Sequence, residues 1–224
     1  MLEDKRIKIF IGHYGSGKTE VAVNFAMKLA DEGKKVALAD LDIVNPYFRS
    51  REKTVDMEEK GITVIGNSLG MKQGVDLPAV SGGIVGPIMD KDCEVILDVG
   101  GNEVGARSLT RFQRYLIDGE YDMFLVLNAN RKETQTVEDA LAHAREIEYA
   151  SRKKITGIIN NTHLLKETSV EDVLRGEELA LQVSEVLQVP IKYTSVLEKV
   201  ARQLPDNIHG EVFPIEMYMR EVWM

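Results

Sequence analysis

The chain has 224 residues, of which 44% are hydrophobic, and its formal net charge at pH 7 is −8. This length and apolar content predict one α/β domain over residues 1–224, and the negative charge argues against a nucleic-acid partner. No apolar run approaches the roughly 18 residues of a membrane span, and the single cysteine, Cys93, excludes an internal disulfide. We therefore expect a cytoplasmic protein without a signal peptide.

Short apolar runs alternate with amphipathic segments along the whole chain. Strands are predicted near Ile7–Ile11, Lys35–Ala39, Ile62–Ile65, Glu94–Val99, Met123–Leu127, Ile155–Asn160 and Ile191–Thr194. Helices are predicted near Lys18–Glu32, Leu77–Met89, Ala106–Ile117, Thr134–Ala150, Val170–Leu187 and Leu197–Leu204. Continuous apolar runs suit strands that are buried on both faces. We therefore expect a single doubly wound, mostly parallel sheet of about seven strands with helices on both faces, and ligands at the carboxyl ends of its strands.

The first strand leads directly into the sequence GHYGSGKT at residues 12–19. Between a strand and a helix, this spacing forms a phosphate-binding loop, because backbone N–H groups surround the phosphate oxygens and the helix dipole favours their charge. We expect Lys18 to reach the β- and γ-phosphates and Thr19 to hold Mg²⁺. The remaining predicted phosphate-binding residues of the loop are Gly12, His13, Tyr14, Gly15, Ser16 and Gly17.

Two acidic residues, Asp40 and Asp42, follow the second predicted strand. Acids at the carboxyl end of a parallel strand lie where such sheets bind ligands. We expect Asp42 to position a water molecule or to act beside Mg²⁺. The alternative is that these acids only cap the loop, since Asp, Asn and Pro are also turn residues.

The fourth predicted strand ends in Asp98 and is followed by Gly100 and Gly101. An apolar strand that ends in Asp fits a Walker B carboxylate, which holds Mg²⁺ through water or through Thr19. The glycines would let the backbone approach a γ-phosphate and move when the phosphate leaves, with Gly101 as the sensor. A simple glycine turn is the alternative.

The sixth predicted strand ends in Asn160 and Asn161, and we expect these amides to contact the nucleotide base. GTP-specific proteins usually carry Asn-Lys-x-Asp at this place, where the Asp reads guanine donors. Leu164 occupies the Asp position here and cannot accept those hydrogen bonds, so the sequence favours ATP over GTP.

In this order of motifs the chain resembles the MinD/ParA-type ATPases of the CobQ/CobB/MinD/ParA nucleotide-binding class. The resemblance lies in GHYGSGKT, the Asp-x-Asp after the second strand, the Leu-Pro-Ala segment, ILDVGG and the late Asn-ended strand. It implies a Mg²⁺-dependent ATPase that binds ATP and ADP and acts as a nucleotide-driven switch on a protein partner. It also implies that Lys18 and Asp42 are catalytic, with Asp42 activating water, and that Thr194, Ser195 and Val196 line the base.

The chain departs from this family at the start of the phosphate-binding loop. The family has a lysine there that reaches the partner's phosphates across a homodimer, whereas this chain has His13, followed by Tyr14 in place of a glycine. A homodimer remains an alternative, but its trans-acting lysine is missing. Glu20 also replaces the usual second Ser/Thr, and an acid there suits the first turn of a helix.

Three arginines flank the two switch-like loops. Arg49, Arg51 and Arg107 are candidates to stabilise transition-state charge. The alternative is that they are surface arginines that pair with Glu52 and Glu103.

Two other functions and one terminal segment complete the predictions. A small-molecule kinase or ligase of the biotin- and cobalamin-synthesis type would use Tyr47, Arg49 and Arg51 as substrate contacts. The second alternative is a nucleotide sensor with negligible hydrolysis, which is plausible because the trans-acting lysine is missing.

Residues 214–224, PIEMYMREVWM, place apolar side chains near helical spacing but lack a lysine-rich face. We therefore expect them to pack on the body or on a partner rather than on a membrane.

Overall fold

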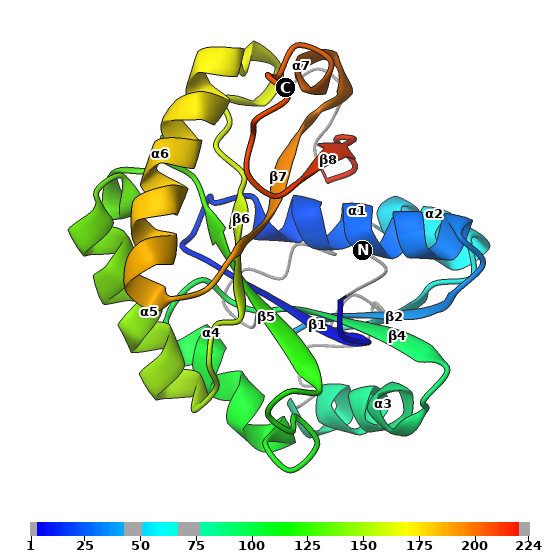
Figure 1. The fold of residues 1–224 in the computed structure, drawn as a ribbon. Coiled ribbons are helices and arrows are strands. Elements are labelled where there is room, and N and C mark those ends of the chain that lie inside the picture. The colour runs from blue at the N-terminus through cyan, green and yellow to red at the C-terminus, as the bar shows by residue number, and fades with distance from the viewer. Residues whose placement is uncertain (1–3, 43–50, 67–76, 220–224) are drawn as a thin grey trace.

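A computed structural model describes residues 4–42, 51–66 and 77–219 of the protein. Its centre is an eight-stranded sheet with the order β3-β2-β4-β1-β5-β6-β7-β8, and every adjacent pair in that order is parallel (Figure 1). The strands are β1 Ile7–Ile11, β2 Lys35–Asp40, β3 Thr63–Ile65, β4 Cys93–Asp98, β5 Tyr121–Leu127, β6 Gly157–Asn160, β7 Ile191–Leu197 and β8 Glu211–Ile215. The helices are α1 Lys18–Asp31, α2 Arg51–Glu59, α3 Leu77–Met89, α4 Glu103–Arg107, α5 Val137–Ser151, α6 Val170–Leu187 and α7 Glu198–Ala201.

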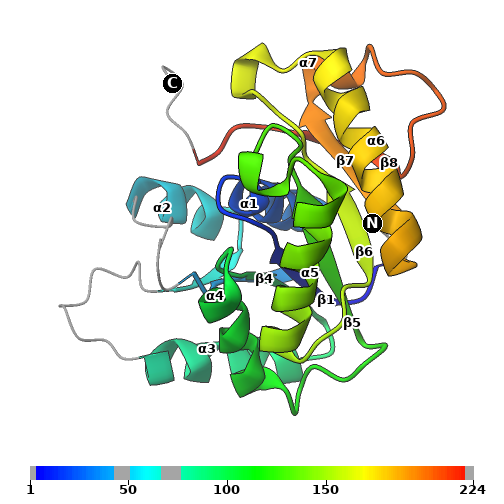
Figure 2. The same ribbon diagram turned by 90° about the vertical axis from the view of Figure 1, so that its left-hand side faces the viewer.

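Helices cover both faces of the sheet. Figure 1 shows α1 and α2 on one side of the central strands and α3 and α4 on the other, and Figure 2 shows α4 and α5 side by side. Alternation along β1 explains the two layers, because Ile9 and Ile11 belong to the core under α3 to α6, whereas Phe10 belongs to the core under α1. Phe25 of α1 packs against the Phe10 ring at 5.0 Å between ring centroids and against the Phe213 ring at 4.4 Å.

The predicted α/β class is confirmed, and all seven predicted strands are present. The sheet has an eighth strand that the sequence analysis missed. This strand, β8, contains Pro214 and buries only Phe213 completely, and proline is tolerated at a sheet edge, so its sequence signal is weak. The missed helix α2 has a polar sequence, in which Thr54 and Met57 are buried.

Two predicted helical regions differ in the structure. The region near Ala106–Ile117 is a short helix α4 followed by a 3₁₀ helix at Ser108–Phe112. The C-terminal segment begins inside β8, and residues 216–219 are not helical. Tyr218 and Met219 pack against the core under α1, which confirms that the described part of this segment packs on the body. In the ranges that the structure describes, no helix is both long and apolar enough to cross a bilayer.

Candidate functional site

The loop between β1 and α1 has the backbone that a phosphate cradle requires. Gly15 and Gly17 have φ values of +80° and +83°, a region that side chains disfavour. A Cβ atom at Gly12 would lie 2.4 Å from the carbonyl oxygen of Val126, so only glycine fits against β5 there. The glycines of the predicted motif are therefore required by the geometry of this loop.

The predicted metal and catalytic residues lie together at the ends of β1, β2 and β4. The Thr19 hydroxyl donates to Asp98 Oδ2 at 2.6 Å, and Lys18 Nζ lies 3.8 Å from Asp42 Oδ2. The backbone N–H of Asp42 donates to Asp40 Oδ1 at 2.9 Å. All five residues are buried, and the charge of Lys18 acts on all three carboxyl groups.

Burial and the neighbouring carboxylates make two of these acids, Asp40 and Asp98, hard to ionise. Loss of hydration raises the pKa of Asp98 to about 6, although Lys18 and the Thr19 hydroxyl favour its charged form. Loss of hydration and the charge of Asp98 raise the pKa of Asp40 to about 8. A cation bound beside these carboxyl groups would favour their ionised forms and lower both pKa values.

The donor set fits a magnesium ion that is held partly by a nucleotide. Asp98 Oδ1 is buried and has no hydrogen-bond partner among the described residues, and Thr19 offers a second oxygen beside it. No group of three His, Cys, Asp or Glu residues in the described ranges is arranged to hold a metal. Mg²⁺ commonly takes one or two protein ligands and completes its shell with phosphates and water, which matches this set.

The glycine segment after β4 touches the phosphate-binding loop. A Cβ atom at Gly101 would lie 2.7 Å from the carbonyl oxygen of Gly12 and 2.8 Å from the backbone nitrogen of Tyr14. The next residue, Asn102, caps α4 by accepting a hydrogen bond from Gly105 N at 2.9 Å. The predicted γ-phosphate sensor is thus in backbone contact with the loop that would hold the phosphate.

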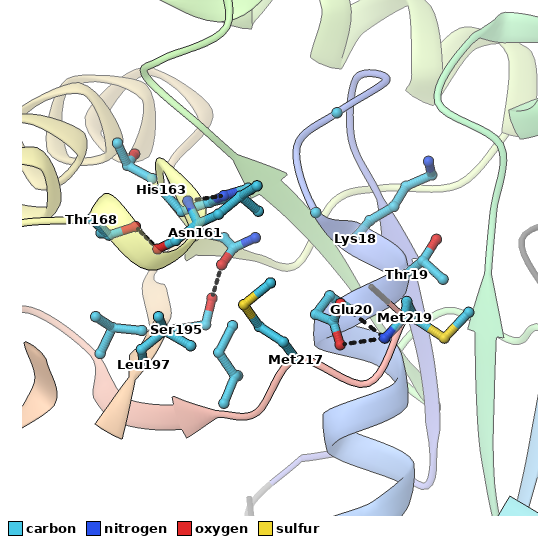
Figure 3. Close-up of a pocket in the computed structure, with 16 residues that line it drawn as sticks. Lys18, Thr19, Glu20, Asn161, His163, Thr168, Ser195, Leu197, Met217 and Met219 are labelled. Atoms are coloured by element: carbon cyan, nitrogen blue, oxygen red, sulfur yellow. Dashed lines mark hydrogen bonds between the residues drawn. The ribbon is translucent and has the colours of Figure 1, made fainter. Parts of the chain in front are cut away.

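A pocket extends from the phosphate-binding loop toward the ends of β6 and β7 (Figure 3). Asn161 Nδ2 donates to the Ser16 carbonyl at 2.7 Å, and its Oδ1 accepts from Ser195 Oγ at 2.9 Å. The lining residues are Gly15, Gly17, Lys18, Thr19, Glu20, Asn161, Thr162, His163, Leu165, Thr168, Ser195, Val196, Leu197, Ile215, Met217 and Met219. The predicted base contacts Asn161, Ser195 and Val196 therefore line one pocket with the phosphate-binding loop.

Two predicted base contacts lie outside this pocket. Asn160 Nδ2 donates to the Val173 carbonyl at 3.0 Å, and Thr194 Oγ1 donates to the His209 carbonyl at 3.1 Å. Both side chains are buried in protein hydrogen bonds, and their positions do not support the prediction that they contact a nucleotide. Residues one apart on a strand point to opposite faces, which explains why Asn161 and Ser195 differ from them.

At the start of the loop, the side chain of His13 contacts protein and that of Tyr14 faces solvent, and their predicted phosphate contacts stay a prediction. The His13 ring lies 5.4 Å from the ring of His143 on α5, and Tyr14 is 56% exposed. Burial, with help from the charges of His13 and Lys18, lowers the pKa of His143 to about 4, so this imidazole is neutral at pH 7. The two rings pack together beside the loop.

Of the three candidate arginines, the structure describes the side chain of Arg107 alone. Arg107 is exposed at the end of α4. Tyr47 and Arg49 lie outside the described residues, as does the side chain of Arg51. The kinase or ligase alternative, which depends on these three residues, therefore stays a prediction.

Sequence reasoning missed two parts of the site. Arg131, four residues after β5, donates from Nε to the Gly15 carbonyl at 2.8 Å and so braces the loop. A closer search of the strand ends could have found it. The other missed part comprises Ile215, Met217 and Met219, which line the pocket from the C-terminal end and match no motif.

Comparison with known families agrees with this geometry. Residues 9–205 match the CobQ/CobB/MinD/ParA nucleotide binding domain. The chain belongs to this family. The predicted resemblance is confirmed, and the chain is a P-loop NTPase related to MinD and ParA. No curated protein sequence matches the chain.

Solved structures show the same fold at low identity. Cell division protein FtsY from Thermotoga maritima is 22% identical with a TM-score of 0.56, over 88% of this chain and 64% of that one. Chloroplast FtsY from Physcomitrella patens is 22% identical with a TM-score of 0.55, and the match covers 83% of this chain and 57% of that one. Signal Recognition Particle 54 kDa protein from Aeropyrum pernix, solved with GDP, is 18% identical with a TM-score of 0.55. This match covers 83% of this chain and 40% of that one. The chain thus spans less than two thirds of each of these structures.

Proposed function

We propose that this P-loop protein is a Mg²⁺-dependent ATPase whose nucleotide state is read by a protein partner. The observation that carries the proposal is the meeting of Lys18, Thr19, Asp42 and Asp98 at one end of the sheet, beside a glycine loop shaped for phosphates. Thr19 and Asp98 would hold the magnesium ion, which neutralises charge on the transferred phosphate.

The chain's own residues supply the remaining chemistry. Lys18 lies 3.8 Å from Asp42 and would exchange this partner for the β- and γ-phosphates of a bound nucleotide. The released Asp42 carboxylate would then orient the attacking water. Gly101, in contact with the loop, would follow the γ-phosphate and transmit its loss to α4.

The residues that line the pocket support adenine rather than guanine as the base in this proposal. Recognition of guanine N1 and N2 donors calls for a carboxylate, and Glu20 is the one carboxylate among the described lining residues. Its oxygens accept hydrogen bonds from the backbone of Tyr218 and Met219. The exposed Leu164 adds no acceptor, in line with the sequence prediction.

Turnover and binding measurements with matched variants test the proposal. We expect calorimetry to show that Lys18→Ala abolishes ATP binding, whereas Lys34→Ala, a change at an exposed lysine, leaves it unchanged. Asp42→Ala should keep ATP affinity and lose phosphate release, because its role is to orient water. Unchanged ATP affinity in Lys18→Ala would refute the site.

Nucleotide preference is tested on the unmodified protein. We expect phosphate release from ATP to exceed that from GTP. Tight ATP binding without ADP formation over hours would support the sensor alternative instead, and a preference for GTP would overturn the argument from Glu20 and Leu164.

A further inference from the structure

The chain beyond β8 returns across the first turns of α1 (Figure 3). We call residues 216–219 the C-terminal strap. Asn24 of α1 makes two hydrogen bonds with the backbone of Glu216, from Nδ2 to its oxygen at 2.8 Å and from its nitrogen to Oδ1 at 2.7 Å. Glu20 accepts from Tyr218 N at 2.5 Å and from Met219 N at 3.1 Å. Two side chains of α1 therefore hold the strap along its whole length.

This contact gives a structural reason for the unusual Glu20. The residue follows Thr19 directly in α1, and it lines the pocket. Backbone N–H groups of the strap donate to the Glu20 carboxylate, and hydrogen bonds to charged groups are stronger than neutral ones. Glu20 therefore acts as a latch for the strap.

The strap and the last residue of β8 together supply an apolar wall to the pocket. Ile215 of β8 and Met217 and Met219 of the strap line it, and Ile215 pairs with Leu197 of β7 in the sheet. Ile215 and Met219 also pack against the core under α1, whereas Met217 belongs to none of the apolar clusters formed by the described residues. In Figure 3, Met217 lies between Ser195 and Glu20.

A half-buried methionine on such a wall suits a flat aromatic ring. Thioether sulfur makes favourable contacts with aromatic groups, and the flexible side chain adapts to the shape of a ring. Three polar side chains of the lining already make hydrogen bonds within the protein, since Ser195 donates to Asn161 and Thr168 donates to the Leu165 carbonyl. Apolar contact is therefore the main interaction that this wall offers.

We propose that the C-terminal strap forms the base-binding wall of the nucleotide pocket, with Met217 packing on the purine ring and Glu20 latching the strap to the phosphate-binding helix. The inference rests on the proposed nucleotide-binding function and deepens it. It assigns the purine contact to the C-terminal end of the chain, outside the matched residues 9–205.

Ligands with and without a base separate the strap from the phosphate site. We expect Met217→Ala to raise the Kd of MgADP about tenfold, because several buried apolar groups are lost, and to leave the Kd of inorganic tripolyphosphate unchanged. Met89→Ala is the matched control, since Met89 is 62% exposed at the end of α3. It should change neither Kd.

A second variant tests the latch. Glu20→Ala should raise the Kd of MgADP and increase amide hydrogen exchange at Tyr218 and Met219, whose N–H groups lose their acceptor. In the unmodified protein with ¹³C-labelled methionine methyl groups, MgADP should shift the Met217 signal and leave that of Met89 in place.

Each outcome decides a different statement. An unchanged MgADP affinity in Met217→Ala, or an unshifted Met217 methyl signal, would overturn the strap proposal alone. Equal losses for MgADP and tripolyphosphate would also overturn it, since the effect would then come from the phosphate site. If the unmodified protein binds neither ligand, the proposed function fails and the strap proposal fails with it.

Discussion

Asp40 offers a direct test of the charge balance at the end of the sheet. Its carboxylate is buried beside Asp98 and Asp42, and Lys18 is the nearby cation that offsets them. Asp40→Asn replaces a carboxyl group that must take up a proton on folding by a permanently neutral amide, and it keeps an oxygen that can accept from the Asp42 N–H. We expect this variant to be more stable than the unmodified protein at neutral pH, without metal or nucleotide.

The expected change in the free energy of unfolding follows from the pKa of Asp40. Asp40 has a pKa of about 8 in the folded protein, against about 3.9 in an unfolded chain. The folded state therefore binds the proton more tightly, so the free energy of unfolding falls as the pH rises from about 4 to about 8. Each pH unit in that window costs up to about 1.4 kcal/mol. Raising the pH from about 5 to about 7.5 should cost at most about 3 kcal/mol through this residue.

Urea unfolding of both proteins in EDTA at these two pH values measures the effect. Asp40→Asn should lose less stability between the lower and the higher pH than the unmodified protein does. Asp56→Asn, at an exposed position of α2, should follow the unmodified protein. Identical pH dependence in Asp40→Asn and the unmodified protein would refute the reasoning, because Asp40 would then be ionised at little cost.

Three further predictions concern the loop contact, the core and the metal. Gly101→Ala should weaken ATP binding by about tenfold or more in calorimetry, because its Cβ would press on the backbone of Gly12; Gly86→Ala, which meets open space, should not. Phe25→Ala should lower the free energy of unfolding by about 3–5 kcal/mol in urea titrations, since its ring fills the core under α1. EDTA should abolish phosphate release and added Mg²⁺ should restore it; turnover that persists in EDTA would contradict the metal assignment.

The sequence predicted those parts of the site that lie on regular strand ends. The phosphate-binding loop follows β1, and Asp98 ends β4, so one rule about parallel sheets placed both correctly at the same edge. The apolar runs of β1, β4 and β5 are buried on both faces, which made them easy to predict.

The sequence could not predict features that depend on side-chain direction or on distant chain segments. Asn160 and Asn161 are adjacent and chemically identical, yet only Asn161 faces the pocket. Nothing local distinguishes them, because which of two adjacent side chains faces the pocket depends on how the strand sits in the sheet. The contact of Glu20 with Met219 joins residues 199 positions apart, so no motif could show it.

The acids at the strand ends favour a switch over a passive binding site. Without a ligand, Asp40, Asp42 and Asp98 are crowded around Lys18, and buried charges without full compensation destabilise a fold. A divalent cation bound at this cluster should therefore stabilise the protein, while a phosphate that attracts Lys18 should weaken the ion pair between Lys18 and Asp42. Metal and phosphate are thus expected to change the same charge balance, the metal by compensating the acids and the phosphate by attracting Lys18. A site in which each ligand changes the energy of the other is suited to report which nucleotide is bound.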